Sequence, residues 1–132
     1  MPIIPEKYLD LLNAKKAFAN IATVMKDGSP QVTPVWFDYK DGIIRVNSAR
    51  GRVKDRNMKS GARVALAIMD PANPYRHIQI RGRVKNVTEK GGSEHIDSLA
   101  KKYLGKDKYP WANPKDVRVI YEIEPMSFST MG

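Results

Sequence analysis

The order of hydrophobic and polar positions predicts a mostly β protein. Residues Ala17–Met25 are small, β-branched and apolar, which is typical of a strand. Asp27-Gly28 follows, and an Asp-Gly pair between two such runs is a strong hairpin signal. The return strand is expected over Gln31–Tyr39, where Pro34 cannot donate to a ladder and so indicates a sheet edge or a bulge.

The rest of the chain adds four further strands. Lys40-Asp41-Gly42 predicts a second tight turn, so the first three strands are expected to form a meander. The run over 63–70 is almost unbroken in its apolar character and predicts a strand that is buried on both faces. Later in the chain, strict alternation of apolar and polar residues predicts strands with one buried and one exposed face. The four strands are expected over 43–47, 63–70, 77–87 and 117–124.

Three helices are expected beside these strands. One spans Pro5–Leu12, a second spans Arg50–Met58 with Ser48 as its N-cap, and the third spans Ser93–Leu104 and ends at Gly105. The hairpin turns are too short for parallel crossovers. We therefore expect one domain over residues 1–132, mainly β with flanking helices (α+β), built as a six-stranded antiparallel barrel.

Composition excludes several kinds of chemistry. The chain has no cysteine, so a disulfide framework, a thiolate nucleophile and a cysteine metal site are excluded, and with two histidines no metal site is expected. No apolar run approaches the roughly 18 residues that span a bilayer, and the first residues do not resemble a signal peptide. We expect a cytoplasmic protein with no membrane partner.

The net charge of +9 indicates an anionic partner. Between Arg50 and Arg63 stand six basic residues and a single acid, Asp55. Ser48, Arg52 and Lys54 lie where a strand is expected to lead into a helix, and a helix N-terminus with such side chains is suited to a phosphate. The alternative is an ordinary solvated basic face.

Four segments in this order resemble the pyridoxamine 5'-phosphate oxidase-like, FMN-binding split-barrel superfamily, and most closely its F(420)-dependent (deazaflavin) reductase branch. The resemblance covers roughly Pro5 to Phe128. The segments are Ala22-Thr23-Val24 with Asp27 to Phe37, Arg50 to Asn57, Asp70 to Arg76, and Ile80-Arg81-Gly82.

This resemblance implies a split barrel and a set of site residues. Arg52, Lys54 and Asn57 would hold the cofactor phosphate, and Ser48 and Ala49 would line the same pocket. The cofactor ring would lie along the second strand, on the backbone of Thr33, Pro34, Val35 and Trp36. Members are homodimers with the cofactor at the subunit interface. The extra C-terminal segment of true pyridoxamine phosphate oxidases is missing, which argues against vitamin B6 oxidation.

The function expected from this resemblance is an oxidoreductase. It would transfer hydride between bound F(420), or alternatively FMN, and a small electron-poor substrate, with no catalytic side chain identified. A cofactor carrier without turnover is a second possibility. A basic nucleic-acid-binding barrel is a third, which the 8% aromatic content without a stacking platform disfavours. The aromatic loop Tyr109-Pro110-Trp111 either caps a substrate pocket or packs over the mouth of the barrel.

Overall fold

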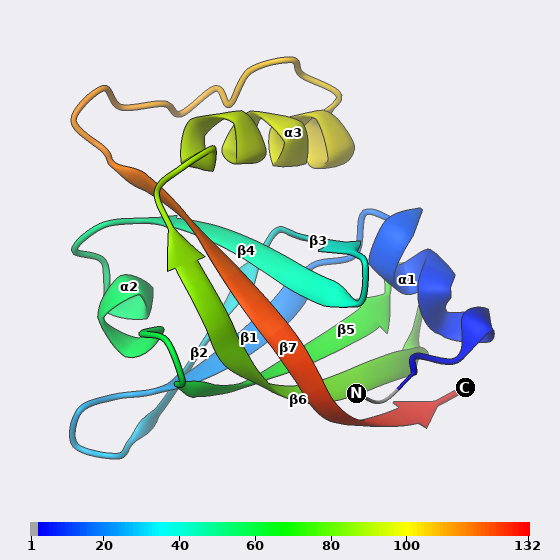
Figure 1. Cartoon of the computed structure of the whole chain (residues 1–132). Helices are drawn as coiled ribbons and strands as arrows, with labels where there is room; N and C mark the ends of the chain where they lie inside the picture. Colours follow the sequence, from blue (N-terminus) through cyan, green and yellow to red (C-terminus); the bar gives the residue numbers. More distant parts are fainter. Residues whose placement is uncertain (1–2) are drawn as a thin grey trace.

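The protein is a curled, seven-stranded antiparallel sheet with helices at its ends (Figure 1). The computed structural model describes residues 3–132. The sheet order is β2-β1-β5-β6-β7-β4-β3. This confirms the mainly β architecture with flanking helices. The elements are η1 (Glu6–Tyr8), α1 (Leu9–Asn13), β1 (Ala19–Val24), β2 (Pro30–Val35), β3 (Phe37–Lys40), β4 (Ile43–Ala49), α2 (Val53–Asn57), β5 (Arg63–Asp70), β6 (Asn73–Thr88), α3 (Gly92–Leu104) and β7 (Arg118–Met131).

The predicted number of six strands is wrong because the expected strand Gln31–Tyr39 is divided at Trp36. Its first part, β2, pairs with β1, whereas its second part, β3, pairs with β4. These two pairs lie at opposite ends of the sheet order, so the predicted three-stranded meander is also wrong. Pro34 lies in the edge strand β2, as expected for a residue that lacks an N–H. Trp36 therefore joins the two edges of the curled sheet.

Strand β5 is not buried on both faces as predicted. Val64, Leu66 and Ile68 point into the core, whereas Met69 between Ile68 and Asp70 is 44% exposed. The outward positions Ala65 and Ala67 are small and only partly buried. An unbroken apolar run thus conceals an ordinary alternation in which the outer face is made of small side chains.

The two longest strands extend well beyond their predicted bounds. Strands β6 and β7 pair along most of their length, with register shifts at Arg81/Gly82 and between Val84 and Asn86. At the first shift, a Cβ on Gly82 would lie 2.7 Å from the carbonyl oxygen of Glu124, so only glycine permits this close approach. Such irregularities bend strands, and the sheet curls in this region (Figure 1).

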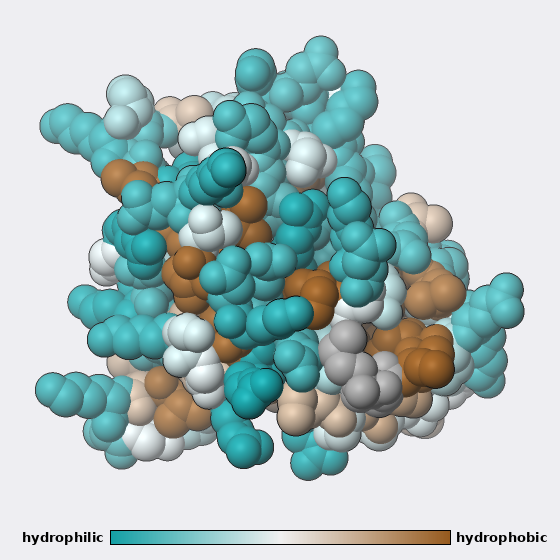
Figure 2. All heavy atoms as spheres, in the orientation of Figure 1, coloured by the Kyte–Doolittle hydropathy of each residue, from teal (hydrophilic) through white to brown (hydrophobic). Residues whose placement is uncertain are grey.

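Helices pack against the curled sheet at two places. Tyr8, Leu11 and Leu12 of η1 and α1 are almost fully buried in the main core. The helix predicted over Ser93–Leu104 is confirmed as α3, which lies above β3 and β4 in Figure 1 and contacts α1 where Lys102 Nζ donates to the carbonyl oxygen of Leu12 at 3.4 Å. No helix within residues 3–132 is long and apolar enough to cross a membrane. The face in Figure 2 is mostly hydrophilic, with its hydrophobic residues in separate patches.

Candidate functional site

A pocket of about 200 Å³ lies where α3 covers the end of the sheet. It brings together segments far apart in the sequence: β2, the end of β4, α2, α3 and the start of β7. Six of the nine predicted cofactor residues line it, namely Pro34, Val35, Trp36, Ser48, Arg52 and Lys54.

One wall of the pocket is aromatic. Trp36 stacks on Tyr103 of α3, with ring centroids 5.3 Å apart and planes within 4°. Tyr109 meets Trp36 edge-on at 6.0 Å, and Trp111 lies at 6.3 Å from it. The loop after α3 therefore packs against the site at the mouth of the barrel, and both of its rings line the pocket. Trp111 remains 62% exposed.

A second part of the lining, the basic wall, contains Arg52 and Lys54. The Arg52 guanidinium lies 3.5 Å from the Asp116 carboxylate, and half of its side chain is exposed. Lys54 is half-buried, and this burial, with Arg52 nearby, lowers the pKa of its ammonium group. Two cations that line the same pocket are thus held close to each other in a partly desolvated environment.

The segment before α2 is organised by Asp55, the single acid of the basic run. One oxygen of Asp55 accepts the Gly51 N–H at 2.9 Å, and the other accepts Arg50 Nη1 at 3.2 Å. The Tyr121 hydroxyl donates to the same carboxylate. The acid therefore shapes the loop that presents Arg52.

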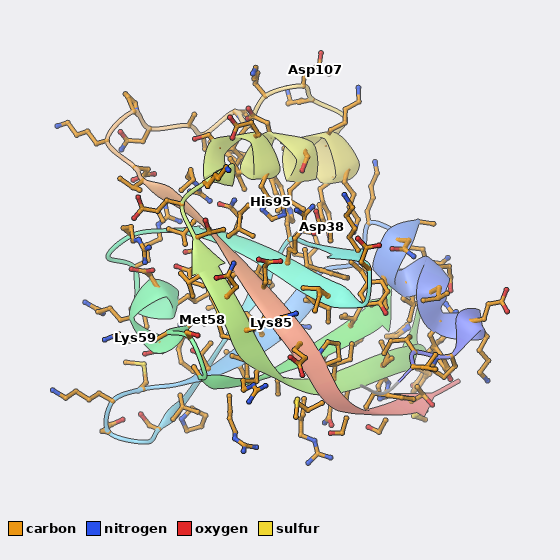
Figure 3. The ribbon with its side chains drawn as sticks, in the orientation of Figure 1. Asp38, Met58, Lys59, Lys85, His95 and Asp107 are labelled. Atoms are coloured by element: carbon orange, nitrogen blue, oxygen red, sulfur yellow. The ribbon has the colours of Figure 1, made fainter. Side chains whose placement is uncertain are left out.

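The predicted helix Arg50–Met58 is shorter than expected, and its predicted cap is wrong. α2 spans five residues with Arg52 at the N-cap position and without a side-chain cap bond. Ser48 instead lies in β4, where its side chain is 2% exposed and its Oγ has no hydrogen-bond partner within residues 3–132. Lys59 lies beyond the helix and points away from the core, in contrast to the buried Met58 (Figure 3). The basic side chains, and not a long helix dipole, define this wall.

Three predicted residues do not line the pocket. The Asn57 amide donates to Thr23 Oγ1 at 3.0 Å and contacts Met25 Sδ at 3.3 Å, so it ties α2 to β1. Ala49 is buried. Thr33 Oγ1 is buried with no partner in the described part of the chain. A role for these residues in cofactor binding stays a prediction.

Sequence reasoning missed a buried polar network beside the pocket. Arg118, which lines the pocket, donates from Nε to Asn47 Oδ1 at 2.9 Å. Asn47 Nδ2 lies 3.1 Å from His95 Nδ1, and His95 Nε2 lies 3.1 Å from Asp38 Oδ2. The residues come from β7, β4, α3 and β3, and no spacing in the sequence connects these positions.

Burial and charge act on the two ends of this network. Burial and the nearby Arg52 lower the pKa of Arg118, against the attraction of Tyr109 and Asp116. Burial alone would raise the pKa of Asp38, but hydrogen bonds from His95 and Arg45 outweigh it and hold that pKa below its usual value. Arg45 makes two such bonds, at 2.8 and 2.7 Å.

A second cavity of about 490 Å³ adjoins the first beneath the loop that follows α3. The two share Ile96, Tyr109 and Arg118 as lining residues. The first pocket alone is smaller than the roughly 300–1,000 Å³ typical of ligand pockets. Across residues 3–132, no three histidine or acidic side chains are arranged to hold a metal ion.

Comparisons with known proteins place this geometry in a family. A search of curated proteins found no match. Among solved structures, an F420 reductase is 34% identical, with 96% of this chain and 98% of that chain covered and a TM-score of 0.83.

Two more distant structures show the fold alone. HupZ from Group A Streptococcus is 18% identical, with 97% and 94% of the chains covered and a TM-score of 0.69. The FAD and heme binding protein from Mycobacterium smegmatis is 16% identical, with 96% and 70% covered and a TM-score of 0.68.

The family model described as pyridoxamine 5'-phosphate oxidase matches residues 4–131, nearly the whole chain. Together with the F420 reductase, it supports a flavin-related function. The chain belongs to the pyridoxamine 5'-phosphate oxidase family.

Proposed function

We propose that the protein is an F420-dependent oxidoreductase that transfers hydride between its bound cofactor and a small electron-poor substrate. The observation that carries the proposal is a single pocket whose lining contains both cations and aromatic rings. This combination suits a molecule that has a phosphate at one end and a flat ring system at the other.

The basic wall fits a phosphate. Arg52 and Lys54 supply charge-assisted donors, and Ser48 Oγ is a buried hydroxyl without a partner in the described residues. A buried polar group without a partner is unfavourable, so a phosphate oxygen at this place would be stabilised by all three.

The part of the lining formed by β2 and Trp36 fits a planar ring. Pro34, Val35 and Trp36 form the end of the edge strand and the crossing to β3, where the sheet is interrupted. When bound, the deazaflavin would supply the hydride chemistry. The chain binds and orients it and excludes water through the aromatic loop.

F420 is preferred over FMN for two reasons. The F420 reductase is the relative at 34% identity. The surplus of basic residues near α2 also suits an anionic tail longer than one phosphate. Of these, Arg50 already pairs with Asp55 and Glu89, whereas Arg56 and Lys59 make no ion pair within residues 3–132.

We also propose that the working unit is a homodimer. A groove of about 390 Å³ runs along the outer face of β1, β5, β6 and β7. Val24 and Met126, each about half exposed, line this groove, and Val32 on the neighbouring β2 is 64% exposed. Arg63, Arg81 and Arg83 also line the groove, and we propose that its apolar part is buried against a second copy of the chain.

The test is calorimetric titration of the purified protein with F420 and with FMN. Tight F420 binding with turnover of electron-poor acceptors by the reduced cofactor is expected. Binding without turnover across a panel of acceptors would indicate a carrier. Failure to bind either cofactor would overturn the proposal.

A further inference from the structure

We propose that Arg118 is a third phosphate-binding residue of this pocket and that Asn47 and His95 position it. The inference rests on the proposed function, because the phosphate is that of the bound cofactor. It extends the proposed phosphate site from the basic segment at α2 to the start of β7.

The guanidinium group of Arg118 is anchored at one nitrogen and lacks an acceptor at another. Its Nε donates to Asn47 Oδ1 at 2.9 Å, and its guanidinium carbon lies 5.4 Å from the centre of the Tyr109 ring. Nη1 is buried and has no hydrogen-bond acceptor in the described part of the chain. A pocket-lining guanidinium that is anchored at Nε and has one nitrogen without an acceptor is suited to an acceptor from outside the chain.

Asn47 is itself held in one orientation. Its Nδ2 donates to the carbonyl oxygen of Gly92 at 2.9 Å and lies 3.1 Å from His95 Nδ1. Because an amide nitrogen can only donate, Nδ1 of His95 accepts and the ring proton is on Nε2. The amide oxygen of Asn47 then faces Arg118.

The next bond fixes the imidazole. His95 Nε2 donates to Asp38 Oδ2 at 3.1 Å, and Figure 3 shows the two residues close together between α3 and the sheet. Arg45 holds the same carboxylate with two hydrogen bonds. Hydrogen-bond donation therefore runs from Arg118 through Asn47 and His95 to the Asp38 carboxylate, which also accepts from Arg45.

The backbone of Arg118 is equally constrained. A Cβ on Gly92 would collide with the carbonyl oxygen of Arg118, so α3 begins directly against this residue. On the other side, Arg118 pairs in register with Ala49 of β4. Both the main chain and the side chain are thus fixed before a ligand arrives.

The ligand chemistry is an oxyanion. Arg118, Arg52 and Lys54 line the same pocket, and the nearby Arg52 disfavours the charged form of both Lys54 and Arg118. An anion among the three cations would relieve this repulsion. The phosphate of the cofactor is the group that the basic wall is already proposed to receive.

The test compares FMN with riboflavin, which has the same ring and no phosphate. Arg118→Met is expected to weaken FMN binding roughly 10- to 150-fold, the loss of one charge-assisted contact, and to leave riboflavin binding unchanged. Lys115→Met is the matched control, because it removes one positive charge from the loop that precedes β7, at an exposed position outside the pocket. If riboflavin binds too weakly to measure, thermal stabilisation by inorganic phosphate replaces it and must also fall in Arg118→Met.

A double-mutant cycle tests the positioning role. Asn47→Ala is expected to weaken FMN binding about tenfold when Arg118 is present and less than twofold in the Arg118→Met background. His95→Gln is the second variant if Asn47→Ala does not fold, and the same dependence on Arg118 is expected. A purely structural role would lower binding of FMN and riboflavin alike in both backgrounds, and that result would overturn the assignment.

Failure of this inference is distinguishable from failure of the proposed function. If Lys54→Met weakens FMN binding and Arg118→Met does not, the pocket binds the cofactor without Arg118. If the parent protein binds neither F420 nor FMN, the proposed function fails and the phosphate role of Arg118 fails with it.

Discussion

Replacing Lys54 by methionine should separate cofactor binding from folding. The ammonium group lines the basic wall of the pocket, and one charge-assisted contact to a phosphate contributes about 1.5–3 kcal/mol. Its loss raises the dissociation constant of FMN roughly 10- to 150-fold. The methionine side chain is similar in length to the aliphatic part of lysine, so packing should be kept.

In contrast to cofactor binding, the stability of the ligand-free protein should be kept or increased by this substitution. Burial and the nearby Arg52 lower the pKa of Lys54, which means that folding disfavours its charged form. The folded state consequently gains stability as the pH rises through this lowered pKa toward the ordinary value of 10.5. Lys54→Met should remove this pH dependence and leave the melting temperature at neutral pH equal to or above that of the parent.

The assays are calorimetric titration with FMN and thermal denaturation from neutral pH to pH 10 without a ligand. Lys115→Met is the control, since it removes an exposed lysine outside the pocket. A variant that melts several degrees lower while binding FMN as tightly as the parent would refute this reasoning.

Three further predictions follow from the same structure. The affinity for the cofactor should depend only weakly on salt. The affinity for single-stranded DNA, if measurable, should fall by roughly three to five decades between low and moderate salt, as for six to ten phosphate contacts. A DNA affinity that survives physiological salt would contradict the pocket assignment. Sedimentation at micromolar concentration should show a dimer, and Val32→Asp should shift it toward monomer, whereas a stable parent monomer would refute the proposed interface. Asp38→Asn should destabilise the fold by about 1–3 kcal/mol at pH 7 because it removes a carboxylate bound by His95 and Arg45; since the pKa of Asp38 is lowered on folding, denaturation curves of the two proteins should converge as the pH falls below the ordinary value of 3.8.

Local patterns in the sequence predicted local structure well. The Asp27-Gly28 turn and the helix at Ser93–Leu104 depend on residues that are close together in the chain, and both are present. The change of partner at Trp36 depends on which strands lie on either side of it after the sheet curls. No local pattern carries this information, and the number of strands was therefore one too few.

The candidate site shows the same difference between local patterns, which the sequence reveals, and long-range contacts, which it does not. Arg52 and Lys54 belong to one short basic segment that follows a strand, so an anion site containing both could be predicted from the sequence. Asn57 belongs to that segment too, but its amide is taken up by Thr23 of β1, a partner that only the folded chain brings near. Arg118 and Asn47 are 71 positions apart in the sequence. Their contact follows from the pairing of β4 with β7, which single-sequence reasoning did not derive.

The crossing at Trp36 has a spectroscopic consequence. The chain has two tryptophans, and both of them, Trp36 and Trp111, line the pocket. All of the indole emission of this protein therefore originates at the site, without a background from the core. Flavins and deazaflavins absorb near-ultraviolet light where indole emits, so a bound ring would receive this energy and quench the signal. The native protein is thus its own optical sensor for occupancy of the pocket.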